Sequence, residues 1–302
     1  MSISKPSQEQ FSKLIKYYQN RQFEDAEKLA VSITKEFPEH QFAWKVLGVI
    51  LIQVGRLSES LTATQKSVEL NPMDNEAHYN LGVVFKGLDR SNEAEKSYRQ
   101  AIKLKPDYAE AHSNLGNTLQ NLGRYVEAEK SYRQAITLKP DYAEVHNNLG
   151  LTLQNLRRLD EAEKSYRKAI ALKPDFTEAH SNLGITLKEL GRLDEAESSY
   201  RKAISLKPDF AEAYNNLGIT LKELGRLEEA MNSYTKAIEL NPHLPESHEN
   251  LLILLTSYVP HKEVLHPIFK VDQKIKEVYL KENISGIISD DKIIELLSKS
   301  SK

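Results

Sequence analysis

A proline recurs every 34 residues through most of this chain of 302 residues. The seven copies are Pro38, Pro72, Pro106, Pro140, Pro174, Pro208 and Pro242. A Leu-Gly pair keeps the same interval, and its six copies begin at Leu47, Leu81, Leu115, Leu149, Leu183 and Leu217. A register held over that length indicates one supersecondary unit copied end to end. Such an array offers a long surface rather than a single pocket.

The clearest copy, residues 109–142, predicts two antiparallel helices. Its first half places apolar or small residues at the i, i+3, i+4 and i+7 positions of one helical face: His112, Leu115, Gly116 and Leu119. Gly123 follows, where the end of a helix favours a left-handed residue. A second stripe then runs up to Pro140, and a proline disfavours helical geometry in the residue before it. Neither helix can cover its stripe alone, so we expect neighbouring repeats to stack.

A row of acidic pairs follows the prolines. In four copies an aspartate (Asp107, Asp141, Asp175, Asp209) is followed three residues later by a glutamate (Glu110, Glu144, Glu178, Glu212). This spacing is typical of a capping box at the start of a helix. We therefore predict that these glutamates cap helices and do not form an acidic binding track.

The combination of Leu-Gly, alanine, tyrosine, alanine and proline in one 34-residue register resembles the tetratricopeptide repeat (TPR). This resemblance implies an all-α fold, a right-handed superhelical solenoid of antiparallel helix pairs. It covers residues 7–244 as seven repeats: 7–40, 41–74, 75–108, 109–142, 143–176, 177–210 and 211–244. Residues 1–6 are then a leader and 245–260 a C-terminal capping helix. Residues 261–302 form a helical tail that could link to a domain absent from this chain.

An asparagine precedes the Leu-Gly pair in most copies, and in this respect the array is similar to the arm of O-linked N-acetylglucosamine transferases and to bacterial TPR relatives. The ladder comprises Asn80, Asn114, Asn148, Asn182 and Asn216, with Asn250 as a further member. At about 100° per residue, each asparagine lies away from the packing face of its helix. The resemblance implies that such asparagines line the concave groove and bind the backbone of an extended peptide. A bond to the adjacent repeat is the equally weighted alternative.

A second row on the same helices carries Asn117, Leu151, Ile185 and Ile219, with Lys188 and Lys222 nearby. Aliphatic side chains facing a groove would suit apolar side chains of a bound segment. Partial burial against the next repeat explains them equally well. Both rows are included in the predicted peptide-binding site.

Other classes of function find no support in the sequence. The chain has no cysteine, and its net charge of −2 does not suggest binding to nucleic acid. The members of the histidine ladder (His78, His112, His146, His180, His248) each lie on a different repeat, and helices about 8–10 Å apart are too distant to share a metal ion. We find no catalytic motif, cofactor loop, signal peptide or membrane span, and so expect no enzyme activity, no cofactor and a cytoplasmic location.

Three functional hypotheses remain. The first is a non-catalytic scaffold that binds an extended protein or peptide segment of unknown identity in the groove. The second is the substrate-recognition arm of a glycosyltransferase similar to the O-linked N-acetylglucosamine transferases, with its catalytic part absent from this chain. The third is a self-assembly module, because residues 264–279 carry an aliphatic stripe that could pair with a second copy.

Overall fold

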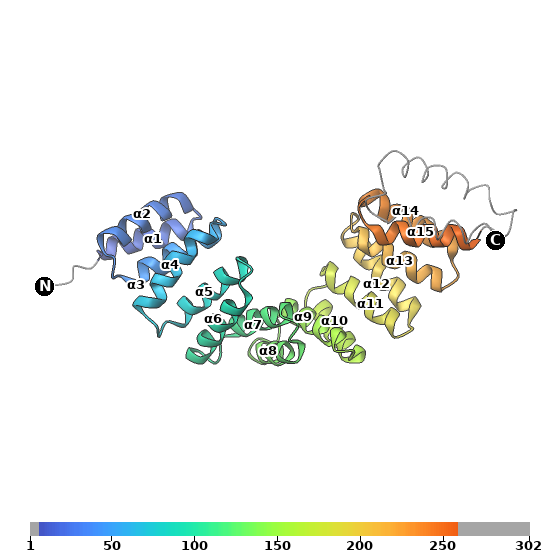
Figure 1. Ribbon diagram of the computed structural model, residues 1–302, viewed down its shortest axis with the longest axis horizontal. Helices are drawn as coiled ribbons and strands as arrows, with labels where there is room; N and C mark the ends of the chain where they lie inside the picture. The colour runs from blue at the N-terminus through green and yellow to red at the C-terminus, as the bar shows by residue number, and fades with distance from the viewer. Residues whose placement is uncertain (1–5, 259–302) are drawn as a thin grey trace. The chain divides into compact units, whose positions relative to one another are not determined.

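A computed structural model describes residues 6–258, with their side chains up to residue 254, as a series of α-helices (Figure 1). The first nine are α1 (Gln8–Gln19), α2 (Phe23–Glu36), α3 (Gln41–Gln53), α4 (Leu57–Leu70), α5 (Asn75–Gly87), α6 (Ser91–Leu104), α7 (Ala109–Asn121), α8 (Tyr125–Leu138) and α9 (Ala143–Asn155). The other six are α10 (Leu159–Leu172), α11 (Thr177–Glu189), α12 (Leu193–Leu206), α13 (Ala211–Glu223), α14 (Leu227–Leu240) and α15 (Pro245–Tyr258). The tail stripe at 264–279 lies outside the described residues.

The chain divides into two compact units, residues 1–158 and 159–302. In the first unit, α1 to α8 form four consecutive antiparallel pairs, and α9 packs on α8. In the second unit, α10 packs on α11, α11 pairs with α12, α13 pairs with α14, and α15 packs on α14. The predicted all-α solenoid of antiparallel helix pairs is confirmed within each unit.

In four of the helix pairs from α5 onwards, a tyrosine of the second helix packs on a glycine of the first helix. The five core tyrosines are fully buried: Tyr98, Tyr132, Tyr166, Tyr200 and Tyr234. A Cβ added to Gly116 would lie 2.6 Å from Cε1 of Tyr132, and the same contact recurs at 2.6–2.7 Å for Gly82, Gly184 and Gly218. Real Cβ atoms do not approach this closely, so the helices can pack at this separation only because the residue lacks a side chain.

The helices end where the sequence predicts. Each second helix stops two residues before its proline, as α8 does at Leu138, and Lys139 has an extended φ of −141°. Gly123 ends the turn after α7 with a left-handed φ of +72°. Arg21 and Asp89 adopt the same left-handed backbone, with φ of 57° in both. A residue with a side chain pays a conformational cost there that glycine avoids.

The prediction of capping boxes at the regular repeats is wrong. A capping box requires the aspartate to be the N-cap, but four of the first helices begin one residue later: α7, α9, α11 and α13. Their N-cap residues are the aromatics Tyr108, Tyr142, Phe176 and Phe210. None of these four N-caps has a side-chain hydrogen bond. Each aromatic ring instead lies under a lysine ammonium, at 4.6 Å for Lys139 and Tyr142. Packing of the aromatic ring displaces the aspartate from the cap position.

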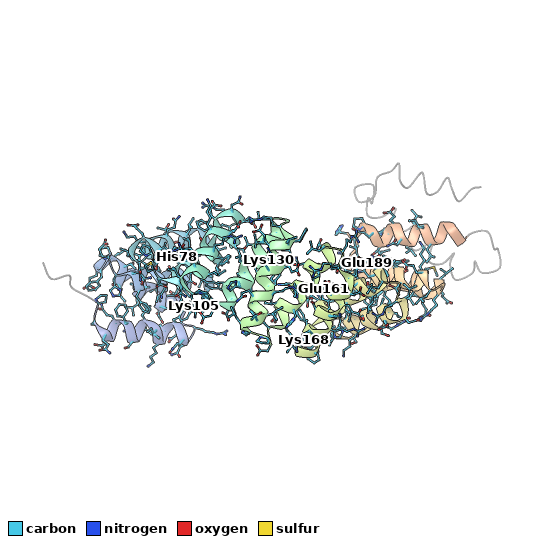
Figure 2. All side chains as sticks on the ribbon, turned by 90° about the horizontal axis from the view of Figure 1, so that it is seen from below. His78, Lys105, Lys130, Glu161, Lys168 and Glu189 are labelled. Atoms are coloured by element: carbon cyan, nitrogen blue, oxygen red, sulfur yellow. The ribbon has the colours of Figure 1, made fainter. Side chains whose placement is uncertain are left out.

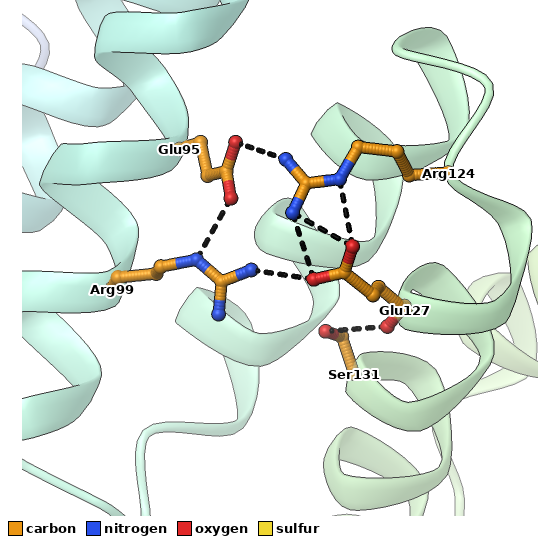
Figure 3. Close-up of polar contacts among 5 residues, drawn as sticks. All are labelled: Glu95, Arg99, Arg124, Glu127 and Ser131. Carbon is orange, nitrogen blue, oxygen red and sulfur yellow. Dashed lines mark hydrogen bonds and ion pairs between the residues drawn. The ribbon is translucent and has the colours of Figure 1, made fainter.

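Charged residues on the second helices join successive repeats. Glu95 of α6 accepts hydrogen bonds from Arg99 Nε at 2.8 Å and from Arg124 Nη1 at 2.6 Å. Both guanidiniums also bond Glu127 of α8, which closes a four-residue ring across two repeats (Figure 3). Two such rings occur in the second unit, Glu163–Arg167–Glu195–Arg192 and Glu197–Arg201–Glu229–Arg226. Within the first ring, Arg99–Glu95 and Arg124–Glu127 are neighbours on one helical turn, and the other two ion pairs join successive repeats.

The histidine ladder holds the turn that precedes each first helix. His112 Nε2 lies 2.9 Å from the carbonyl oxygen of Pro106, and His78, labelled in Figure 2, lies 3.0 Å from that of Pro72. Trp44 occupies the same position in an earlier repeat, and its indole N–H donates to the carbonyl of Pro38. A carbonyl only accepts, so the histidines act as donors there, as the indole does. Their role is therefore to close a turn.

Candidate functional site

The predicted site residues lie on the first helices of the repeats. In the first unit, α5 carries Asn80, α7 carries Asn114 and Asn117, and α9 carries Asn148 and Leu151. In the second unit, α11 carries Asn182, Ile185 and Lys188, and α13 carries Asn216, Ile219 and Lys222. All of them are half-buried. We call the surface that they form within each unit the asparagine face.

Part of the asparagine ladder bonds the preceding repeat. Asn114 Nδ2 donates to the hydroxyl of Tyr79 at 3.0 Å, and Asn148 Nδ2 donates to Oδ1 of Asn117 at 2.9 Å. On α15, Asn250 Nδ2 donates to Oδ1 of Asn215 at 3.1 Å. These amides therefore act as links between repeats, which was one of the two alternatives for the ladder.

Other members of the ladder have no such link. The side chains of Asn80 and Asn216 form no hydrogen bond with any described residue. At the positions that bond the asparagine in other repeats, the preceding repeat offers Asn216 the short side chain of Ser181 and the aliphatic Ile185. An amide has two donor hydrogens and a carbonyl acceptor, so these two side chains can bind the N–H and C=O groups of another backbone.

Asn117 differs from the aliphatic residues in its row. Its Oδ1 accepts hydrogen bonds from the hydroxyl of Tyr132 at 2.7 Å and from Asn148. The same hydroxyl lies 2.9 Å from Oε1 of Gln120. In this repeat the polar groups of the asparagine face therefore satisfy one another.

The core tyrosines are functional candidates that the sequence reasoning missed. Each ring passes the glycine of the first helix, and the contacts of Tyr132 show that the hydroxyl then reaches the asparagine face. Burial raises the pKa of all five phenols. The hydroxyls of Tyr98, Tyr200 and Tyr234 are buried without a hydrogen-bond partner among the described residues. The signal was present in the sequence as the residues one turn after the glycine, which are glutamine in some repeats (Gln120, Gln154) and lysine in others (Lys86, Lys188, Lys222).

The lysines on this face differ in their surroundings. Lys188 Nζ lies 3.9 Å from Oε1 of Glu223 in the next repeat, which is a long ion pair. Lys86 holds the same position on α5 and forms no ion pair or hydrogen bond with another described residue. Burial lowers the pKa of Lys86, because no anion compensates for its loss of hydration.

The described residues offer neither a metal site nor a membrane-spanning helix. No group of three or more histidine, aspartate or glutamate side chains between residues 6 and 254 is arranged to hold a metal ion. None of the helices α1 to α15 has the length and apolar character needed to cross a membrane.

Models of one protein family match the chain along most of these helices. Models described as tetratricopeptide repeat match residues 15–72, 109–142, 143–176, 165–198 and 211–244, and one described as TPR repeat matches residues 90–123 and 186–225. Together these segments span more than half of the sequence. The chain belongs to the TPR family. Its repeats are those of a protein-interaction scaffold.

Solved TPR structures resemble this TPR chain closely enough to be superposed. YrrB, described as a TPR protein with an unusual peptide-binding site, is 26% identical with a TM-score of 0.54, over 62% of this chain and 96% of that chain. MamA is 27% identical with a TM-score of 0.52, over 54% of this chain and 95% of that chain. PilF of Pseudomonas aeruginosa shares the fold at 23% identity and a TM-score of 0.61, over 69% and 95% of the two chains. The search of curated proteins gave no match.

Proposed function

We propose that this TPR chain is a non-catalytic scaffold that binds an extended protein segment on its asparagine face. The observation that carries the proposal is the state of Asn80 and Asn216. Each is half-buried on a first helix and makes no hydrogen bond with another described residue. An extended backbone presents one donor and one acceptor per residue, which a row of amides can match without reading the side chains.

The linked asparagines support the same proposal in a second way. Because Asn114 and Asn148 each use an amide N–H to bond the preceding repeat, their amide planes are held in place. An orientation fixed before binding reduces the entropy that a ligand must remove. The aliphatic side chains of Leu151, Ile185 and Ile219 add half-buried apolar surface that can contact side chains of the bound segment.

The resemblance to YrrB bears on the proposal as an analogy. That protein is described as having a peptide-binding site, and the likeness covers most of its length. The analogy favours a peptide ligand as a class and gives no identity for it.

The ligand can be identified by cross-linking. A photoreactive residue at position 216 would capture the bound segment in the source cell, and mass spectrometry would identify its sequence. A synthetic peptide of that sequence then allows calorimetric titration of purified variants.

Two asparagine variants separate binding from stability. Asn216→Ala should lower the affinity for the peptide by roughly twofold to tenfold, the loss expected for one net hydrogen bond. It should leave the unfolding free energy nearly unchanged. Asn148→Ala should lower both quantities, because its amide also links two repeats. Asn232→Ala is the matched control, since this asparagine is exposed on the second helix α14. Unchanged affinity in Asn216→Ala, with a cross-link formed elsewhere, would show that the segment binds another surface.

A further inference from the structure

Two positions of the asparagine face decide whether the tyrosine beneath them is satisfied. In the repeat 109–142, the hydroxyl of Tyr132 lies 2.7 Å from Oδ1 of Asn117 and 2.9 Å from Oε1 of Gln120, and its one hydrogen is shared between these acceptors. In the repeat 75–108 the corresponding residues are Val83 and Lys86. A valine has no acceptor and an ammonium only donates. The hydroxyl of Tyr98 is accordingly buried with no partner among the described residues.

The geometry places the two donors together. The ring of Tyr98 lies against Gly82, since a Cβ there would be 2.6 Å from its Cε1, the same value as for Gly116 and Tyr132. Lys86 follows Gly82 by one helical turn, as Gln120 follows Gly116. The hydroxyl that meets Gln120 in one repeat therefore meets the stem of Lys86 in the other. Tyr79 borders the same place, with its ring centroid 5.9 Å from that of Tyr98.

The charge of Lys86 is uncompensated. A half-buried ammonium without an anion is unfavourable, and adding a carboxylate beside it would relieve the loss of hydration. In the second unit the charge of the corresponding Lys188 is compensated by Glu223, which lies 35 residues further along the chain. The residue 35 positions after Lys86 is Asn121, which is neutral.

We propose that Lys86 and the hydroxyl of Tyr98 form a subsite for the carboxylate of an aspartate or glutamate side chain in the bound segment. One carboxylate accepts from both the ammonium and the phenol, and so satisfies the orphaned donor and the unpaired charge together. The stem of Lys86 is long and flexible, and its movement gives the ligand access to the hydroxyl. A side-chain carboxylate fits better than the end of a peptide chain, because α5 lies between α3 and α7 and a bound segment can continue past it in both directions.

Helices α11 and α12 of the second unit carry the same pair in a blocked form. The hydroxyl of Tyr200 also lacks a hydrogen-bond partner, but Lys188 already has Glu223 within 3.9 Å. Glu189, labelled in Figure 2, adds a second negative charge near this phenol and, with Glu223, contributes to its raised pKa after burial. An acidic side chain is therefore repelled here and attracted at Lys86. The subsite rests on the proposed function, since the carboxylate would belong to a segment lying on the asparagine face.

A small probe tests the subsite without any peptide ligand. The full chain with isotope-labelled lysine is titrated with N-acetyl-aspartyl amide and, separately, with its neutral isostere N-acetyl-asparaginyl amide. We expect a saturable chemical-shift change of Lys86 with the first compound only, larger than that of the exposed reference Lys130 (Figure 2). Tyr98→Phe should weaken this binding about tenfold, because a hydrogen bond to a charged group is lost. N-acetyl-alanine, whose only carboxylate is terminal, should bind less tightly.

Two reciprocal substitutions serve as matched controls. Asn121→Glu places an acid where Glu223 stands relative to Lys188, and it should abolish the response of Lys86. Glu223→Gln removes the acid in the second unit and should create a response at Lys188. Circular dichroism of each variant checks that the chain is folded.

The subsite is refuted if the charged and neutral probes shift Lys86 equally, or if Lys86 responds no more than Lys130. Insensitivity to Tyr98→Phe and Asn121→Glu would refute it as well, and tighter binding of N-acetyl-alanine would assign the carboxylate to a chain end. These results would not bear on the proposed contacts between the asparagines and a peptide backbone. The titration of Asn216→Ala tests those contacts separately, with the peptide as ligand. Failure of the subsite and failure of the proposed function are therefore distinguishable.

Discussion

The contact between Gly116 and Tyr132 allows a quantitative test of how the repeats hold together. Gly116→Ala would place a methyl group 2.6, 2.7 and 2.9 Å from three atoms of the tyrosine ring. The ring is rigid and fully buried, so it cannot turn away without moving a helix. Overpacking of this kind costs about 1–3 kcal/mol, and three contacts below 3.0 Å favour the upper end of that range.

Helix propensity and hydrogen bonding also change the free-energy cost of Gly116→Ala. Alanine is a better helix former than glycine by about 1 kcal/mol, which offsets part of the clash. Displacing the ring also strains the hydroxyl contacts with Asn117 and Gln120, each worth about 0.5–1.5 kcal/mol net. We expect Gly116→Ala to lower the unfolding free energy by roughly 2–4 kcal/mol. Gly218→Ala should cost less, because the hydroxyl of Tyr234 has no described partner to lose.

A double-mutant cycle tests the cause of the loss. In a Tyr132→Ala background the clash is absent and only the helix propensity remains, so Gly116→Ala should become stabilising by about 1 kcal/mol. Equilibrium urea unfolding followed by circular dichroism measures both changes, and hydrogen exchange of α7 and α8 shows whether the effect is local. A destabilisation of the same size in both backgrounds would refute the packing argument.

Three other predictions concern stability. Arg21→Gly should raise the unfolding free energy by about 1 kcal/mol in urea titrations, because the residue has a left-handed φ of 57° that disfavours a side chain; a loss of stability would contradict this. Glu95→Gln should lower the melting temperature by leaving Arg99 and Arg124 close together, and the difference from wild type should shrink in high salt, since exposed charges are screened. Burial raises the pKa values of the core tyrosines. Their contribution to stability is therefore complete below about pH 10, the pKa of a tyrosine in the unfolded chain, and is lost as the pH rises through the folded-state values. Unfolding curves recorded at alkaline pH would show this loss.

The fold could be predicted because its determinants are local and repeated. Pro140 ends a helix through its own backbone chemistry, and Gly123 adopts a left-handed φ that it tolerates better than other residues. Gly116 is small and Tyr132 is large, and both recur at the 34-residue interval, so their contact also depends on residues that the repeat register marks. Each of these properties belongs to a residue and its immediate neighbours, so the sequence contains it.

The candidate site was less predictable because its determinants join repeats. Arg124 completes a ring with Glu95 across 29 residues, a separation that no helical periodicity marks. The asparagine ladder looked uniform, yet the side chain of Asn148 bonds Asn117 while that of Asn216 forms no hydrogen bond with a described residue. The capping prediction failed for a related reason, since the helix start is set by an aromatic packing against a lysine of the preceding turn.

The differences between repeats therefore lie in very few positions. The packing residues are nearly invariant in the repeats from residue 75 onwards, so they present the same tyrosine to the asparagine face. Whether that tyrosine is satisfied depends on two residues of the first helix: Asn117 and Gln120 supply acceptors in one repeat, and Val83 and Lys86 supply none in another. Changing these residues alters what a repeat can bind at little cost in stability, because they lie outside the packing stripe. An array of near copies can in this way acquire a specific ligand while its scaffold stays unchanged.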